Sequence, residues 1–257
     1  MPARLALVAA FGLYGVWTFA TWFFEGRIET LRRPDAVVDR LVYALVVNLA
    51  LGIGAGAAYL AWRVRALRMD PARAGFGAWR RTVLAVNAGL ILGSGAYVLQ
   101  GAPSTDPIVV LNAYCQVLAV SAAEIVVCWC VAGVALEAWM PNARGALATV
   151  AAAFGAALLF GVYHFAHSAP FNTWGMVALL SAVGLASGAF FFVSRDALGS
   201  VVFHNFLGTF GVLRALAEAD ALAPLERIQP ALVGTALATI ALLLGAQVWM
   251  RRQRRSR

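Results

Sequence analysis

Two histidines and one glutamate in apolar sequence are the side chains of this chain best suited to chemistry. Glu124 lies in the run Ser-Ala-Ala-Glu-Ile-Val-Val-Cys, and His164 ends the run Phe-Gly-Val-Tyr-His. His204 follows three apolar residues and is itself followed by Asn205. Ionisable side chains inside an apolar helix cost several kcal/mol unless they face a protein interior or a water-filled cavity. We therefore expect these residues to form a functional site within a helical bundle.

The composition of the chain predicts an integral membrane protein. Of its 257 residues, 62% are hydrophobic and only 12% are charged, which leaves too few polar groups to cover a soluble domain of this length. A helix needs about 20 apolar residues to cross a bilayer. We expect an all-α, polytopic transmembrane helical bundle that forms one integral-membrane domain over residues 1–257. The sequence offers about eight apolar runs, near residues 5–24, 41–62, 82–99, 108–136, 146–168, 174–194, 199–216 and 231–250.

The arginines predict how the bundle lies in the membrane. Residues 63–81 contain six arginines against one acid, Asp70, and the segment after residue 250 contains five more. Because positively charged loops stay in the cytoplasm, both termini are predicted to be cytoplasmic. The net charge of +8 therefore reports orientation in a lipid bilayer and not nucleic-acid binding. Arginine without lysine, together with abundant alanine, suggests a GC-rich bacterial source and hence the bacterial inner (plasma) membrane.

Four further residues with reactive side chains are expected to have packing or interface roles. His167 lies near the predicted outer end of its span, where histidines commonly cap a helix or face the interface. The three cysteines lie within one predicted span and have no partner elsewhere, so we expect neither a disulfide framework nor a thiolate zinc site. A thiolate in hydrocarbon is disfavoured, which makes them small packing residues. They are Cys115, Cys128 and Cys130.

Two stretches match sequence motifs of a known family. Phe160 and His164 fit a Phe-x-x-x-His motif, and the glycine-spaced run from Gly184 to His204 resembles the approach to a second histidine motif. In these features the chain resembles the CAAX prenyl endopeptidase and bacteriocin-processing group of glutamate-dependent intramembrane proteases. Its members have Glu-Glu-x-x-x-Arg on one helix, Phe-x-x-x-His on the next, and His-x-x-x-Asn or a similar motif after a glycine-rich helix and a tight turn. The resemblance covers about residues 120–215, within a protease-like core of about residues 108–216.

The chain departs from the family pattern at three positions. In the first motif, Ala123 stands in place of the first glutamate and Cys128 in place of the arginine. In the third, Gly208 stands four residues after His204, and the nearest asparagine is Asn205. Adjacent residues point about 100° apart on a helix. These departures concern activity more than fold.

The resemblance implies an endopeptidase that cuts a membrane-associated peptide or protein. Glu124 would activate water for attack on a peptide carbonyl, while His164, His204 and Asn205 would help to bind the oxyanion. This chemistry requires no metal and no cofactor. Two other functions remain open. One is a catalytically inactive relative that acts as a membrane binding or scaffold protein, and the other is a haem-binding membrane cytochrome in which two histidines ligate iron.

The predicted spans place the two histidines at different depths. If their helices are centred near residues 157 and 207, His164 lies about 10 Å outward of the midplane and His204 about 5 Å inward. A separation of about 15 Å is too large for a shared site. Only tilt or a displaced helix would bring the two side chains together.

Overall fold

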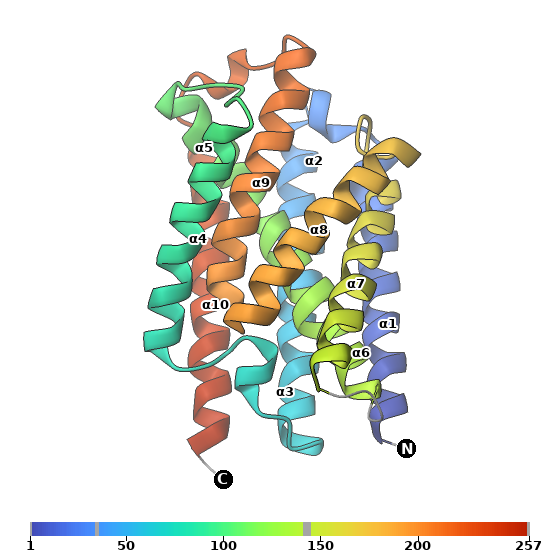
Figure 1. Ribbon diagram of the computed structural model, residues 1–257. Helices are drawn as coiled ribbons and strands as arrows, with labels where there is room; N and C mark the ends of the chain where they lie inside the picture. Colours follow the sequence, from blue (N-terminus) through green and yellow to red (C-terminus); the bar gives the residue numbers. More distant parts are fainter. Residues whose placement is uncertain (1, 34–35, 141–144, 256–257) are drawn as a thin grey trace.

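The computed structural model describes residues 2–33, 36–140 and 145–255, and this part of the chain contains helices and no strand (Figure 1). Within it, eight helices are long and apolar enough to cross a membrane. The predicted all-α transmembrane bundle is therefore confirmed. Six of the spans are α1 (Pro2–Thr21) with the π turn Trp22–Gly26, α4 (Trp79–Leu99), α7 (Gly145–Tyr163), α8 (Trp174–Ser194), α9 (Ala197–Glu218) and α10 (Pro230–Arg255). A seventh is one continuous helix made of α2 (Val37–Val42), the π segment Tyr43–Ala55 and α3 (Gly56–Ala66). The eighth is also continuous and consists of α5 (Pro107–Glu124), the π segment Ile125–Gly133 and α6 (Val134–Trp139).

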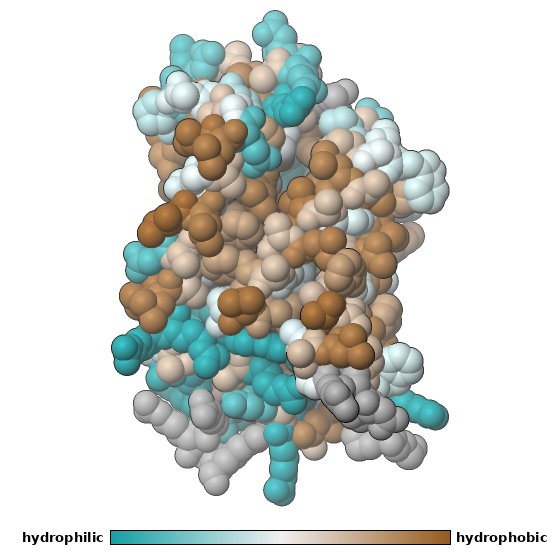
Figure 2. Space-filling view, in the orientation of Figure 1, coloured by the Kyte–Doolittle hydropathy of each residue, from teal (hydrophilic) through white to brown (hydrophobic). Residues whose placement is uncertain are grey.

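On the face seen in Figure 2, apolar side chains form a belt between two hydrophilic ends. Large apolar side chains such as Ile91, Leu99 and Val193 point outward, as expected where lipid and not water is the solvent. The two termini lie at the same end of the bundle, together with the arginine-rich segment 63–81 (Figure 1). This arrangement agrees with an even number of spans, and the cytoplasmic location of that end stays a prediction.

Short polar side chains begin the helices that position the candidate site. Asp106 accepts hydrogen bonds from the backbone N–H groups of Ile108 (2.7 Å) and Val109 (3.2 Å) at the start of α5. Thr173 caps α8, where its Oγ1 accepts from the N–H of Met176 at 3.3 Å. These caps satisfy N–H groups that have no partner inside the helix.

The continuous helix from Pro107 to Trp139 is the centre of the bundle. Its apolar membrane-spanning stretch is 94% buried, against 22–44% for the other spans. The helix packs against α1, α3, α7, α9 and α10. The helix adopts π geometry directly after Glu124, a feature frequent at functional sites. Because protein surrounds this helix, an ionisable residue on it avoids the lipid.

The turn between α8 and α9 is held by the segment that precedes α4. The N–H of Ala197 donates to the carbonyl of Gly75 at 2.9 Å. Gly75 has a φ of 93°, and a Cβ on it would lie 2.8 Å from that nitrogen, so glycine is required there. Asp196 caps α9 through Gly199 N–H (2.9 Å) and accepts from Thr82 Oγ1 (2.6 Å). With the turn held inside the bundle, α9 begins well above the end at which both termini lie (Figure 1).

Candidate functional site

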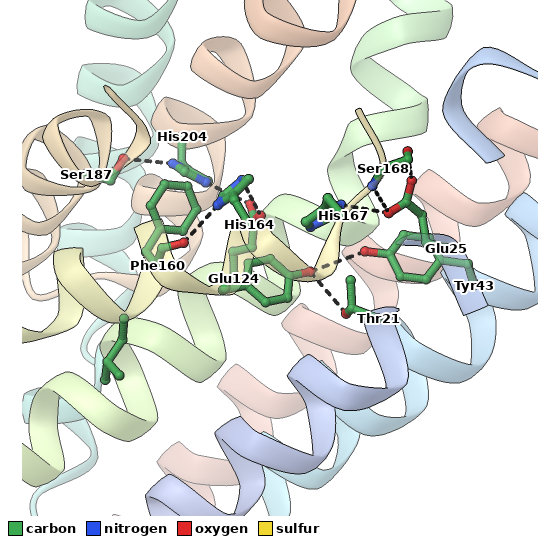
Figure 3. Close-up of polar contacts among 12 residues, drawn as sticks. Thr21, Glu25, Tyr43, Glu124, Phe160, His164, His167, Ser168, Ser187 and His204 are labelled. Carbon is green, nitrogen blue, oxygen red and sulfur yellow. Dashed lines mark hydrogen bonds and ion pairs between the residues drawn. The ribbon is translucent and has the colours of Figure 1, made fainter. Parts of the chain in front are cut away.

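All three histidines of the chain lie around one buried glutamate (Figure 3). Glu124 is the last residue of α5 and is 5% exposed. Its Oε2 is 2.9 Å from Nε2 of His204 on α9, and its Oε1 is 3.8 Å from Nε2 of His164 in the 3-10 turn after α7. The rings of His164 and His167 pack together with centroids 5.1 Å apart. The structure thus brings together Glu124, His164 and His204, for which the sequence predicts a shared site.

His164 and His204 meet because α7 and α9 are displaced along the bundle. α7 begins near the end that holds the termini, whereas α9 begins well above it (Figure 1). His204 therefore reaches the end of α7 about two turns into α9. The expected separation of about 15 Å is wrong, because it assumed that both helices straddle the same midplane.

A serine orients His204. Ser187 Oγ on α8 is 2.7 Å from Nδ1 of His204. Since a carboxylate only accepts, Nε2–H of the histidine donates to Glu124, and Nδ1 of the neutral ring accepts from the serine hydroxyl. The ring also packs against Phe160 and Trp129, with centroids 5.1 and 5.6 Å away. Together these contacts leave His204 a single orientation.

The helix that leads to His164 supplies its hydrogen-bond acceptor. Its Nδ1–H donates to the backbone carbonyl of Phe160, four residues earlier, at 2.8 Å. The Phe160 ring packs against both His164 and His204, with centroids 4.6 and 5.1 Å away. The Phe-x-x-x-His spacing thus supplies an acceptor and a packing surface from one residue. Nε2 of His164 is too far from Glu124 for a direct hydrogen bond, so the two atoms face each other across a gap.

A second carboxylate reaches the site from the end of α1. Glu25 is 5% exposed, and its Oε2 is 3.1 Å from Nδ1 of His167, which donates to it. The carboxylate also accepts from the N–H of Ser168 at 3.0 Å and from its hydroxyl. Nε2 of His167 is buried and has no hydrogen-bond partner among the residues that the structure describes. The sequence does not predict Glu25 as a site residue, because the polar segment after residue 24 reads as lying outside the membrane.

Hydroxyl groups next to Glu25 tie three helices together. The Tyr163 hydroxyl lies 3.2 Å from both Thr21 Oγ1 and the Tyr43 hydroxyl. The Tyr163 ring stacks on Trp17, with centroids 4.0 Å apart. These contacts fix the end of α1, and with it Glu25, against the end of α7 (Figure 3).

Asn205 and the cysteines lie outside the site. Asn205 is on another face of α9, where its Nδ2 donates to the backbone carbonyl of Tyr114 at 3.0 Å. It does not line the cavity at Glu124, as the offset of about 100° between adjacent helix positions requires. The structure therefore does not bring this predicted residue to the others. Buried free thiols that pack in the apolar core are Cys115, Cys128 and Cys130.

A cavity of about 740 Å³ opens onto the site, within the range of about 300–1,000 Å³ that is typical of ligand pockets. Glu25, Glu124 and the three histidines form its polar base, and mostly apolar side chains from α2, α5, α8, α9 and α10 form the wall. The exposed pair Arg214 and Glu218, at the end of α9, also lines the cavity. The end of α9 lies at the end of the bundle opposite the termini (Figure 1). The exposed side chains of Arg214 and Glu218 indicate that the cavity opens there.

Comparisons with known proteins give no family assignment. No protein-family model matches the chain, and no curated protein or solved structure matches it either. The function is therefore inferred from the geometry of the site.

Proposed function

We propose that the protein is an intramembrane endopeptidase in which Glu124 activates water, and that it is a divergent relative of the CAAX prenyl endopeptidase and bacteriocin-processing group. The observation that supports this best is the position of Glu124, buried at the base of a cavity between His164 and His204. A general base needs a fixed position beside its substrate and partners that hold it there. Both histidines are themselves held by hydrogen bonds, so the group is preorganised.

Glu124 takes a proton from water in the first step. Its Oε2 accepts from His204, which leaves Oε1 for the water. As the proton moves to Oε1, the water oxygen bonds to the carbonyl carbon of the substrate. When the C–N bond breaks, the same proton passes from the glutamate to the leaving amine. The carboxylate is restored and the protons balance.

His164 lies beside the place where negative charge develops. Its Nε2 is 3.8 Å from Oε1 of Glu124, so a carbonyl attacked by water at Oε1 is next to the ring. In the neutral ring, whose Nδ1–H donates to Phe160, Nε2 is an acceptor. When the ring gains a proton, Nε2–H donates to the oxyanion. One such donor is worth about 10²–10³-fold in rate.

Close helix packing accounts for the absence of the first glutamate of the family motif. Ala123 is fully buried, and a Cβ added to Gly52 would lie 2.5 Å from the Ala123 Cβ. A longer side chain at position 123 does not fit in this contact. A second carboxylate, that of Glu25, is nevertheless present in the cavity.

The substrate that we propose is a membrane-tethered peptide or protein. The apolar wall of the cavity suits an apolar segment, and its polar base suits a peptide bond. A substrate chain would enter near Arg214 and Glu218, where the cavity meets water. With the termini in the cytoplasm of a bacterial cell, this entrance faces the outer side of the inner membrane.

The test compares membranes that contain the wild-type protein with membranes that contain the Glu124→Gln or Glu226→Gln variant. New N termini of membrane proteins are identified by mass spectrometry, and a peptide that spans a wild-type-dependent cut is then assayed with purified protein. Glu124→Gln keeps size and hydrogen bonding but removes the base, so we expect the rate to fall by about 10²–10⁴-fold. Glu226 is exposed and lies outside the cavity, so its variant should cleave at the wild-type rate.

Two outcomes would point to the other functions. Unchanged cleavage by folded Glu124→Gln protein would contradict the endopeptidase and leave a non-catalytic binding protein in its place. A haem absorbance band in the purified wild type would instead favour the cytochrome.

A further inference from the structure

Three side chains with acceptor atoms lie together at the base of the cavity. The Nδ1–H groups of His164 and His167 donate to the Phe160 carbonyl and to Glu25, so each neutral ring presents Nε2 as a lone pair. Oε1 of Glu124 is the third acceptor. Among the described residues, Glu124, His164 and His167 offer ligand atoms that all lie within 4.8 Å of one another. A cation held by all three side chains would also give Nε2 of His167 the partner that it lacks among the described residues.

The distances suit one small metal ion. Two ligand atoms that are each about 2.1 Å from a zinc ion lie at most about 4.2 Å apart. Nε2 of His164 and Oε1 of Glu124 are 3.8 Å apart, which is inside this limit. The upper bound for the group, 4.8 Å, exceeds this limit by only about half an ångström.

Each of the three side chains has the outer hydrogen bond that is typical of a metal ligand. A histidine that binds a metal almost always donates its other N–H to a carbonyl or a carboxylate. His164 donates to a backbone carbonyl at 2.8 Å, and His167 donates to Glu25 at 3.1 Å. The Glu124 carboxylate in turn accepts from His204 at 2.9 Å. These bonds fix the directions in which all three ligands point.

The charge of the site also favours a divalent cation. Glu25 and Glu124 are both buried, and the ion pairs that they form in the described part of the chain are with histidines. One divalent ion balances two carboxylates without protonation of any histidine, and an unbalanced buried charge is costly. Two imidazole nitrogens with one carboxylate suit zinc, whereas magnesium and calcium prefer oxygen ligands.

We propose that Glu124, His164 and His167 bind one Zn²⁺ ion, whose fourth position is open to the cavity. Two histidines and a glutamate are a known ligand set of zinc sites with an open position. The ion uses Oε1 of Glu124, the oxygen that takes the proton from water in the proposed endopeptidase. A zinc-bound Glu124 cannot act as that base. If the proposed function holds, zinc therefore blocks cleavage reversibly.

Metal content tests the site without any substrate. The full chain is purified with a tag that contains no histidine, equilibrated with zinc sulfate and desalted, and its zinc is measured by inductively coupled plasma mass spectrometry. We expect one zinc per chain in the wild type and background levels in the His164→Gln and His167→Gln variants. The matched control removes every thiol, and it should keep its zinc. This control variant carries the substitutions Cys115→Ala, Cys128→Ala and Cys130→Ala.

Thermal unfolding shows whether the variants are folded. An ion that binds only the native protein raises Tm. Zinc should raise the Tm of the wild type and not that of His167→Gln, while the two zinc-free proteins unfold at similar temperatures. Cobalt is a second readout, because a site with tetrahedral nitrogen and oxygen ligands gives visible absorption in the wild type itself. Background zinc in the wild type, or wild-type zinc in the folded His164→Gln/His167→Gln double variant, would overturn the site.

The metal site and the endopeptidase can fail separately. Background zinc in the wild type leaves the endopeptidase untouched, whereas full cleavage by Glu124→Gln removes the endopeptidase and leaves the metal site. In the cleavage assay, Zn²⁺ should abolish wild-type activity and a chelator should restore it. Unchanged cleavage by zinc-loaded protein would overturn the blocking role.

Discussion

Glu124 accepts a hydrogen bond from a histidine whose own tautomer depends on a serine. Ser187 donates to Nδ1 of His204, which places the ring proton on Nε2, toward the carboxylate. Without that hydroxyl, the neutral ring can hold its proton on Nδ1. A lone pair would then face the carboxylate and push it out of position. Ser187 thus controls the tautomer of His204 as well as its orientation.

Ser187→Ala should lower kcat about tenfold with little change in KM. The variant loses the hydrogen bond that orients His204, the partner of Glu124, and such a bond is worth about 1.4 kcal/mol. Steady-state cleavage of the substrate peptide measures both constants. Ser181→Ala is the control on the same helix, since that hydroxyl donates to the Val177 carbonyl of its own helix, at 2.8 Å, and does not line the cavity. Equal kcat values for the two variants would contradict the role of Ser187.

Restoration of the family glutamate by Ala123→Glu should reduce the amount of folded protein and should not raise activity. Overpacking against Gly52 costs about 1–3 kcal/mol, and the buried charge adds to this cost. Folded yield and Tm in detergent measure the effect. Ala123→Ser adds one small atom and should be much milder. A folded and more active Ala123→Glu protein would show that the helices can separate.

The sequence predicts some site residues and not others for a physical reason. Glu124, His164 and His204 stand out because ionisable side chains are costly in apolar runs. Glu25 does not stand out, since it follows a span and lies among charged residues where acids are common. Ser187 is hidden for the opposite reason, because serine is ordinary inside membrane helices.

At the scale of elements, the depth of α9 could not be predicted. The length of an apolar run gives the length of a helix but not the level at which the helix begins. That level is determined by two contacts. Asp196 accepts a hydrogen bond from Thr82, which is 114 positions away in the chain, and the N–H of Ala197 donates to the carbonyl of Gly75. Contacts between distant segments have no local signal in the sequence.

Asp196 should make stability depend on pH. Burial raises the pKa of its carboxyl group, so the folded state favours the protonated form. Stability from this group is present below the pKa of the unfolded state and is lost as pH rises through the folded pKa. Asp196→Asn, which still caps α9, should therefore become more stable than the wild type as pH rises. At acidic pH the Tm values of the two proteins should converge.

Asp196→Ala separates the cap from the charge. It should lower the free energy of unfolding by about 0.5–2 kcal/mol because the N-cap is lost. Asp70→Ala, which removes the cap of a short 3-10 turn, should cost less. Equal losses for the alanine and asparagine variants of Asp196 would contradict its assignment as the cap of α9.

At the scale of the whole molecule, the number of spans was predictable because bilayer thickness sets the length of an apolar run. The bilayer also requires every backbone group to be satisfied within a helix. Because the described part of the chain has eight spans, an even number, both termini lie at one end of the bundle, together with the arginine-rich segment 63–81 (Figure 1). Their side of the membrane depends on charge.

Reporters that are active only in the cytoplasm should give signals when fused at Met69 and after Arg257. The reason is the six arginines near the first position and the five near the second. A fusion at Asp106, in the loop between α4 and α5, should be silent. Signals of opposite kind from Met69 and Arg257 would require an odd number of spans.

The burial of the central helix dictates an order of assembly during synthesis. The chain is made from its N-terminus, so α7, α8, α9 and α10 do not yet exist when residues 107–139 enter the bilayer. In that interval Glu124 lacks both His164 and His204 and faces lipid or the earlier helices. A carboxyl group in that position is costly. Arrival of α7 and α9 therefore gives the Glu124 carboxyl group its histidine partners and removes this cost.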